Sequence, residues 1–131
     1  MKKQMDDLAK LLVRLKAEDY CYLTTTGRVT GNPHEIEIWF GLNDTTLYLM
    51  SGDGKSDWVK NLRKNPSVTV RIAKQTFKAS ARLVKDDGEE TMARYMLAEK
   101  YQEWEDDKTL SEWARTALVV GIGIALLEET I

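Results

Sequence analysis

The chain has 131 residues, of which 43% are hydrophobic and 31% are charged, a composition typical of globular proteins and not of disordered ones. Lys and Arg number 19 and Asp and Glu number 21, so the formal net charge of -2 does not favour a nucleic-acid-binding surface. The single cysteine and single histidine exclude an intramolecular disulfide framework, a multi-cysteine zinc site and a histidine-rich metal site.

No signal peptide is apparent, and the longest apolar run, 117–127, is shorter than the about 20 residues that a membrane helix needs. We therefore expect a cytoplasmic protein that inserts into no membrane and binds no nucleic acid.

Apolar periodicity and turn residues divide the chain into helices and strands. Leucines at three- and four-residue spacing predict the first helix, and the pair Asn65-Pro66 ends the second, which Ser56 caps. The expected elements are a helix at 4–17; strands at about 20–26, 34–41 and 46–51; a short helix up to 64; strands at 67–73 and 76–84; helices at about 89–104 and 109–116; and a strand at 117–127.

Short connections make the successive strands antiparallel, because parallel strands need long crossovers. The order predicts an α+β fold, a six-stranded antiparallel barrel with helices packed outside, in one domain over residues 1–131.

Two loops are rich in hydrogen-bond donors. The first, 24–33, combines threonines, two glycines and Arg28, and it is either an anion-binding turn or an ordinary hairpin. The second, 51–62, leads from a strand end through glycines, Lys55 and Ser56 to a helix N-terminus, and it is either an anion site or a capped helix with a flexible loop. If both loops lie at one end of the barrel, they can hold one phosphorylated ligand.

Two further residues are weighed as reactive groups. His34 is either a general acid or base, or a surface hydrogen-bonding residue. Cys21 lies on an expected strand, where a buried small apolar side chain is more common than a nucleophile. No residue is assigned as catalytic, and no metal site is expected.

The stretch 23–72 carries LTTTGRVTGNP and then LYLMSGDGKSDWVKNLRKNPSVTVRI. It resembles the flavin/deazaflavin-dependent oxidoreductase family, which includes the deazaflavin-dependent nitroreductases. The resemblance implies a split β-barrel related to pyridoxamine-phosphate-oxidase-like FMN-binding proteins, a bound coenzyme F-420 (a deazaflavin) or FMN, and a homodimer.

The resemblance also implies roles for residues in the two loops. Arg28 and Lys55 would pair with phosphate or carboxylate groups of the cofactor, and Trp58 and Asn61 would lie beside it. Hydroxyl hydrogen bonds would come from Thr26, Thr30, Ser51 and Ser56. Val29 and His34 stand where the nitroreductases commonly carry basic residues, which favours a shorter tail and hence FMN.

The expected function is hydride transfer between the flavin or deazaflavin and a small organic acceptor such as a nitro, enone or quinone compound. The alternatives are a non-catalytic flavin- or tetrapyrrole-binding carrier of the same fold, and a dimeric structural domain whose ligand site has decayed. The sequence does not identify the acceptor or the direction of hydride transfer.

Overall fold

The structure is a computed structural model that describes residues 2–102 and 109–124. Its helices are α1 (Lys2–Lys16), α2 (Asp57–Lys64), α3 (Asp87–Tyr101) and α4 (Glu112–Thr116). Its strands are β1 (Cys21–Thr26), β2 (Pro33–Ile38), β3 (Gly41–Asn43), β4 (Thr46–Ser51), β5 (Ser67–Ile72), β6 (Gln75–Leu83) and β7 (Leu118–Gly123). None of the described helices combines the length and the apolar character needed to cross a membrane.

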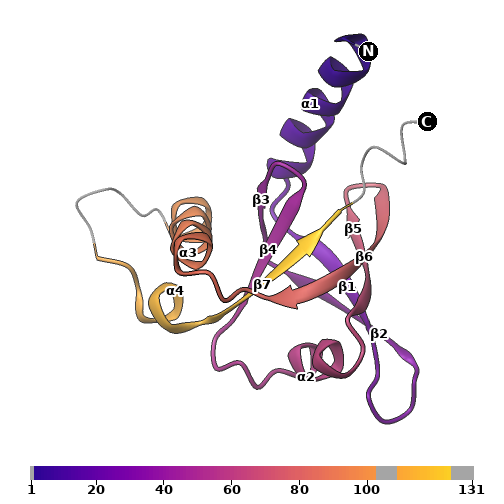
Figure 1. Ribbon diagram of the computed structural model, residues 1–131, viewed down its shortest axis with the longest axis vertical. Helices are drawn as coiled ribbons and strands as arrows, with labels where there is room; N and C mark the ends of the chain where they lie inside the picture. Colours follow the sequence, from indigo (N-terminus) through magenta and orange to yellow (C-terminus); the bar gives the residue numbers. More distant parts are fainter. Residues whose placement is uncertain (1, 103–108, 125–131) are drawn as a thin grey trace.

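The strands form one antiparallel sheet in the order β2-β1-β5-β6-β7-β4-β3, which curls into a half-barrel with the helices outside it (Figure 1). The α+β class and the antiparallel split barrel are thus confirmed, but the strand number of six is wrong. The expected strand at 34–41 is two strands, because the chain bends at Trp39 and Phe40 and passes from one edge of the sheet to the other. Strands that bend in this way form the corners of barrels and sandwiches.

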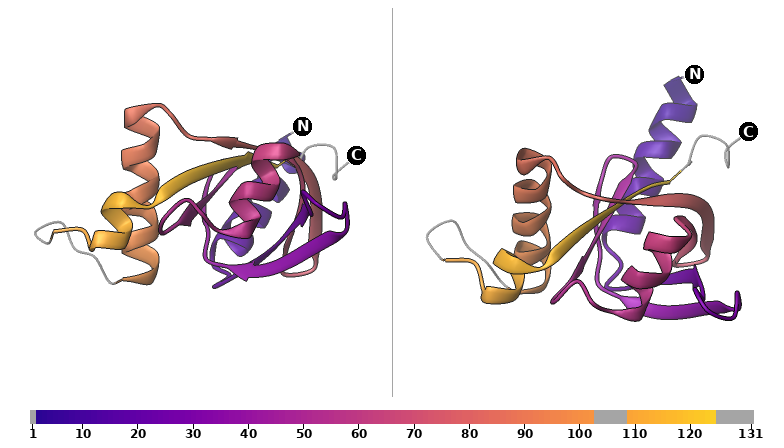
Figure 2. Two further views of the ribbon diagram at one scale, coloured as in Figure 1. Left: turned by 90° about the horizontal axis from the view of Figure 1, so that it is seen from below. Right: turned by 60° about the horizontal axis from the view of Figure 1, so that its bottom comes forward.

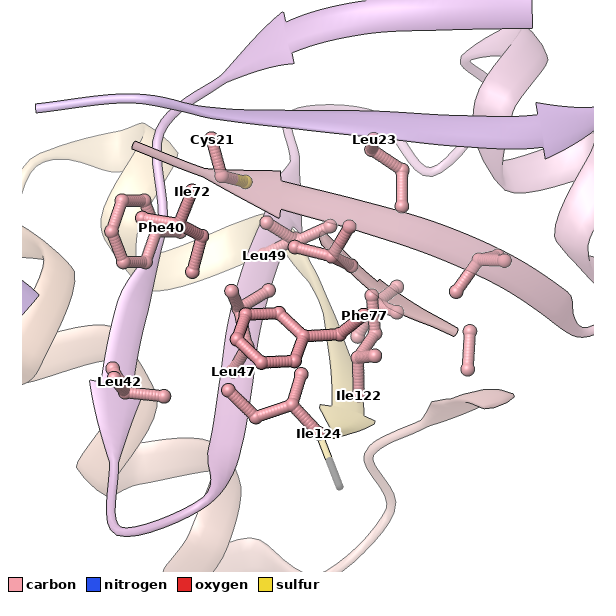
Figure 3. Close-up of a cluster of buried hydrophobic side chains, with 14 of the residues drawn as sticks. Cys21, Leu23, Phe40, Leu42, Leu47, Leu49, Ile72, Phe77, Ile122 and Ile124 are labelled. Carbon is pink, nitrogen blue, oxygen red and sulfur yellow. The ribbon is translucent and has the colours of Figure 1, made fainter. Parts of the chain in front are cut away.

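The concave face of the sheet encloses the main core (Figure 3). Alternation along β1 turns Cys21, Leu23 and Thr25 inward, and each is at most 2% exposed. Phe77 from β6 fills the centre, as the alternating pattern of 76–84 predicts. Leu15 near the end of α1 is also buried in this core. The inward threonine of β1 becomes important below, because it lies under the loop that carries Arg28.

A second, smaller core lies between the convex face of the sheet and helices α3 and α4, which stand together on one side of the barrel (Figure 2). Asp86 caps α3 by accepting a hydrogen bond from the Glu89 N–H at 2.8 Å, so the helix begins slightly before the expected residue 89. The helix expected at 109–116 is confirmed only for 112–116. Helix α3 ends at Tyr101 with Gln102 as its C-cap, and the predicted ends at 103–104 and 125–127 lie outside the described residues.

An ion pair connects the sheet to α3. Arg82 donates two hydrogen bonds to Glu89 at 2.9 and 2.6 Å, and Tyr48 donates a third at 2.5 Å. These bonds, first those from Arg82, lower the pKa of Glu89 to about 2. Gly121 lies under the Arg82 guanidinium, where the methyl group of an alanine would come within 3.2 Å of the guanidinium carbon, so close packing accounts for this glycine.

The bend between β2 and β3 is held by the end of α3. The Phe40 N–H donates to the Tyr101 hydroxyl at 3.0 Å, and the Phe40 carbonyl accepts from Tyr101 at 2.9 Å and from the Lys100 ammonium at 3.2 Å. Trp39 stacks on the Tyr101 ring with centroids 4.5 Å apart. Burial lowers the pKa of Lys100 to about 8 and raises that of Tyr101 to about 12.

Candidate functional site

The turn between β1 and β2 is attached to α2 by one buried amide. Asn61, only 3% exposed, accepts hydrogen bonds at its Oδ1 from the Arg28 N–H at 3.1 Å and from Arg28 Nη1 at 2.9 Å. Its Nδ2 donates to Thr25 Oγ1 at 3.2 Å. One side chain therefore fixes both the backbone and the guanidinium of Arg28 against the barrel.

Two further contacts restrict Arg28. Its Nη2 lies 3.2 Å from Asp57 Oδ1 in the first turn of α2, and the Lys64 ammonium donates to its carbonyl at 2.9 Å. Both pairs lie at the surface, so each contributes little stability, but together they orient the arginine. The guanidinium keeps N–H groups that Asn61 and Asp57 do not occupy, since it carries five.

A cleft of about 410 Å³ lies between this turn and α2, within the size range of small-molecule sites. We call it the Arg28 cleft. It brings together four of the eight residues that the sequence nominated, Arg28, Thr30, Trp58 and Asn61. Its other lining residues are Thr25, Gly27, Val29, His34, Glu35, Ile36 and Asp57.

The remaining four nominated residues lie elsewhere. Thr26 points to the opposite face of β1, where it lines a hollow together with residues of β5 and β6. Ser51 is buried, and its hydroxyl lies 2.8 Å from that of Ser56. Lys55 lines a second cleft on the other side of α2.

The N-terminus of α2 has no side-chain cap. Ser56 occupies the N-cap position as predicted, but it forms no capping hydrogen bond, because its hydroxyl is directed at Ser51. The N–H groups of the first turn, at Asp57 and Trp58, are thus not satisfied by a cap, and both residues line the Arg28 cleft. Such N–H groups favour a bound anion.

Sequence reasoning missed Thr25 and Asp57 as parts of this site. The alternation of Cys21, Leu23 and Thr25 is the signal that could have placed Thr25 inward and Thr26 outward. The sequence indicates only a helix-terminal charge for Asp57, and its contact with Arg28 depends on how the turn folds onto α2. Burial raises the pKa of Cys21 to about 12, which fits a structural thiol and not a nucleophile.

The residues of the Arg28 cleft suit an anionic cofactor with a flat ring. The guanidinium, the Thr30 hydroxyl and the uncapped helix terminus supply donors for phosphate or carboxylate oxygens. The Trp58 indole and Ile36 supply apolar surface beside them. Among the described residues, no group of three His, Cys, Asp or Glu side chains gathers to hold a metal ion.

A curled antiparallel half-barrel with helices packed outside it defines the class of split β-barrel proteins. The sequence profile of the F420H2-dependent quinone reductases matches residues 2–119, and the chain belongs to that family. The family is defined by a deazaflavin-dependent reduction, in agreement with the resemblance of residues 23–72.

Solved structures with the same fold cover several functions. A putative pyridoxamine 5'-phosphate oxidase from Listeria innocua is 19% identical over 89% of this chain and 92% of that one, with a TM-score of 0.68. The heme storage protein HutZ from Vibrio cholerae is 17% identical over 89% of both chains, with a TM-score of 0.69. An F420-H2 dependent reductase, FDR-A, is 19% identical over 79% of this chain and 93% of that one, with a TM-score of 0.63.

Proposed function

We propose that residues 1–131 form one domain that binds coenzyme F-420 or FMN in the Arg28 cleft and reduces a small organic acceptor. A quinone is the acceptor class that the family name indicates, and nitro and enone compounds have the same requirement for hydride transfer. The observation that carries the proposal is the immobilised Arg28 beside an uncapped helix terminus, in a cleft of ligand size.

The four cleft residues that the sequence analysis named have roles that follow from their positions. The N–H groups of Arg28 that are not bonded to Asn61 or Asp57 donate to the anionic tail, and Thr30 adds a hydroxyl. Trp58 offers an apolar wall for the ring. Asn61 acts through Arg28, because its amide oxygen accepts both hydrogen bonds from Arg28 while its nitrogen donates to Thr25.

When bound, the cofactor supplies the hydride chemistry. The chain's own contribution is to fix the ring beside the acceptor, and no side chain is assigned as a proton donor, because solvent can supply the proton. Ser51 and Ser56 support the loop before α2 by bonding to each other. Thr26 and Lys55, which lie outside the cleft, do not touch the ring in this proposal.

A carrier that binds a flavin or tetrapyrrole without turnover is the second candidate. The haem-storing neighbour shares the fold, and His34 lines the Arg28 cleft, where an imidazole can ligate iron. Binding of haemin with a His-ligated absorbance band, together with no turnover on any acceptor, would favour this function over the reductase.

The experiment is an anaerobic titration of the protein with reduced coenzyme F-420 and with FMN, followed by assays on a quinone, an enone and a nitro compound. We expect at least one cofactor to bind tighter than the high micromolar range and to be oxidised by an acceptor. The Arg28→Ala variant should bind roughly tenfold to a hundredfold more weakly, as expected for a charge-assisted hydrogen bond.

Lys74→Ala removes an exposed positive charge on the β5–β6 turn and serves as the matched control, which should bind as the parent protein does. Failure of both cofactors to bind, or equal losses in the two variants, would contradict the assignment of the Arg28 cleft.

A homodimer in the cytoplasm stays a prediction. Light scattering at micromolar concentration tests the dimer, and a monomeric mass there would refute it.

A further inference from the structure

Half of the sheet has an outward side that no described helix covers. Helices α3 and α4 pack on the convex side of β4 and β7, and they stand apart from β1, β2 and β5 (Figure 2). Helix α2 meets β1 from its inward side, through the hydrogen bond between Asn61 and Thr25. The outward side chains of β2, β1, β5 and β6 are therefore exposed or half-buried.

Pairing between the strands sorts the charges on this side of the sheet. Thr24 of β1 lies opposite Glu35 of β2 and Thr69 of β5, and Thr69 in turn lies opposite Lys78 of β6. Directly paired residues of antiparallel strands share a face, so these four form a row that begins with a carboxylate and ends with an ammonium group. The neighbouring row consists of Glu37, Tyr22, Arg71 and Thr76. We call these two rows the outer face.

The charges at the two ends of the first row are free to pair with another molecule. Lys78 is exposed and forms no ion pair or hydrogen bond with any residue in 2–102 or 109–124. Glu35, with 52% of its side chain exposed, lies 3.6 Å from Arg71. A surface contact of that length contributes little, and a carboxylate accepts several hydrogen bonds at once. Both groups can therefore form a further ion pair.

A dimer with two-fold symmetry uses the same surface on both copies, so this surface must be complementary to itself. The outer face meets that requirement for one orientation of the axis. An axis parallel to the strands, between β1 and β5, places β2 of each copy over β6 of the other, so Glu35 meets the partner's Lys78 and Lys78 meets the partner's Glu35. An axis across the strands would instead place Glu35 against the partner's Glu35, and these like charges would repel each other.

The middle of the outer face also suits a second copy of the chain. Its side chains Thr24 and Thr69 are uncharged, and they line a hollow of about 480 Å³. A hydroxyl group both donates and accepts hydrogen bonds, so it can pair with the same kind of group on the partner. The charge of Arg71 is already held by the Tyr22 ring, whose centroid lies 4.1 Å from the guanidinium carbon, and by Glu35.

We propose that two copies of this chain associate through the outer face, around a two-fold axis parallel to the strands, with an ion pair between Glu35 and Lys78 at each end of the contact. Two exposed ion pairs and a polar centre imply a weak dimer in exchange with the monomer. The proposal assigns a surface to the homodimer that the family resemblance implies. It does not rest on the proposed function, because no cofactor enters the argument.

The test is sedimentation velocity of the full chain, without cofactor, over a concentration series into the high micromolar range. Glu35→Lys and Lys78→Glu each turn both ion pairs into like-charge contacts, so each variant alone should dimerise at least about tenfold more weakly than the parent. An equimolar mixture of the two variants again joins opposite charges at both ends of the contact. We therefore expect the mixture to dimerise within about threefold of the parent.

Two matched controls carry the same charge changes on other elements. Glu99→Lys on α3 and Lys85→Glu in the connection between β6 and α3 change exposed residues outside the outer face, and each variant should dimerise like the parent. Circular dichroism of every variant checks that the chain remains folded, as expected for substitutions at exposed positions.

Three results would overturn the proposal: a monomeric parent throughout the series, equal losses in the controls and the outer-face variants, or no recovery in the mixture. Tighter association of Glu35→Lys with the parent than of the parent with itself would also refute it, because that result requires the axis across the strands. Absence of cofactor binding by a chain that dimerises as expected would contradict only the proposed function.

Discussion

Replacing Asn61 by Ala should weaken both the fold and the site, because this amide joins the first hairpin to α2. The change removes two hydrogen bonds from Arg28 and one to Thr25, all at a side chain that is 3% exposed. A hydrogen bond with a charged partner contributes about 1.5–3 kcal/mol and a neutral one about 0.5–1.5 kcal/mol. We therefore expect the free energy of unfolding to fall by about 3 kcal/mol.

Urea denaturation at pH 7, followed by circular dichroism, measures this loss. Asn61→Asp is the informative second variant, because its carboxylate still accepts from both Arg28 donors and the Thr25 hydroxyl can reverse to donate. It should lose clearly less stability than Asn61→Ala. Lys60→Ala, at an exposed position of the same helix, should change stability by less than about 0.5 kcal/mol.

Cofactor affinity supplies the second readout for Asn61. Without the amide, Arg28 is free to leave the cleft, so affinity for the cofactor should fall in Asn61→Ala and largely persist in Asn61→Asp. If the free energy of unfolding of Asn61→Ala falls by less than about 1 kcal/mol, the amide does not connect the hairpin to α2 as described. Equal stability and equal cofactor affinity of the two variants would lead to the same conclusion.

Three further predictions test other parts of the structure. Hydrogen bonds lower the pKa of Glu89 to about 2, so its stabilising contribution is present above about pH 4.5 and is lost as pH falls toward 2; the difference in urea stability between the parent and Glu89→Gln should shrink over that range. Gly27→Ala, whose added methyl meets a backbone oxygen at 3.0 Å and an imidazole nitrogen at 2.6 Å, should cost about 1–2 kcal/mol, whereas Gly123→Ala, with open space around it, should cost less than about 0.5 kcal/mol in the same assay. Tyr101→Phe leaves the part-buried Phe40 N–H without its acceptor and should cost about 1–3 kcal/mol by thermal or urea unfolding; a neutral effect would refute the role of that hydroxyl.

The sequence predicted the fold well where the pattern is local. Alternation in 76–84 and the stop signal at Asn65-Pro66 placed β6 and the end of α2, because both signals act within a few residues. The division of 34–41 into β2 and β3 was missed. The bend at Trp39 and Phe40 depends on contacts with α3, about 60 residues further along the chain, which no local pattern reveals.

The sequence named four of the residues that line the Arg28 cleft, but it did not reveal the contacts between them. Motif residues such as Arg28 and Asn61 were found, since the family pattern places them. Their mutual hydrogen bond was not foreseen, because it requires the hairpin to fold over α2. Lys55 was grouped with Arg28 on its donor chemistry and on the family resemblance, yet α2 separates the two side chains into different clefts. The sequence shows that Lys55 lies just before α2, but it does not show on which side of the helix the lysine side chain lies.

The corner where β2 passes into β3 has a consequence for how the barrel opens. The N–H and carbonyl of Phe40 are bonded to side chains of Tyr101 and Lys100, and neither is bonded to a strand within residues 2–102 and 109–124. If the last turn of α3 moves away, the corner therefore loses its hydrogen bonds while the hydrogen bonds between the strands stay intact. This is a local opening of the structure and not global unfolding. Hydrogen exchange at the Phe40 amide should then report the docking of a distant helix, while the amides of β5 and β6 exchange only when the whole barrel melts.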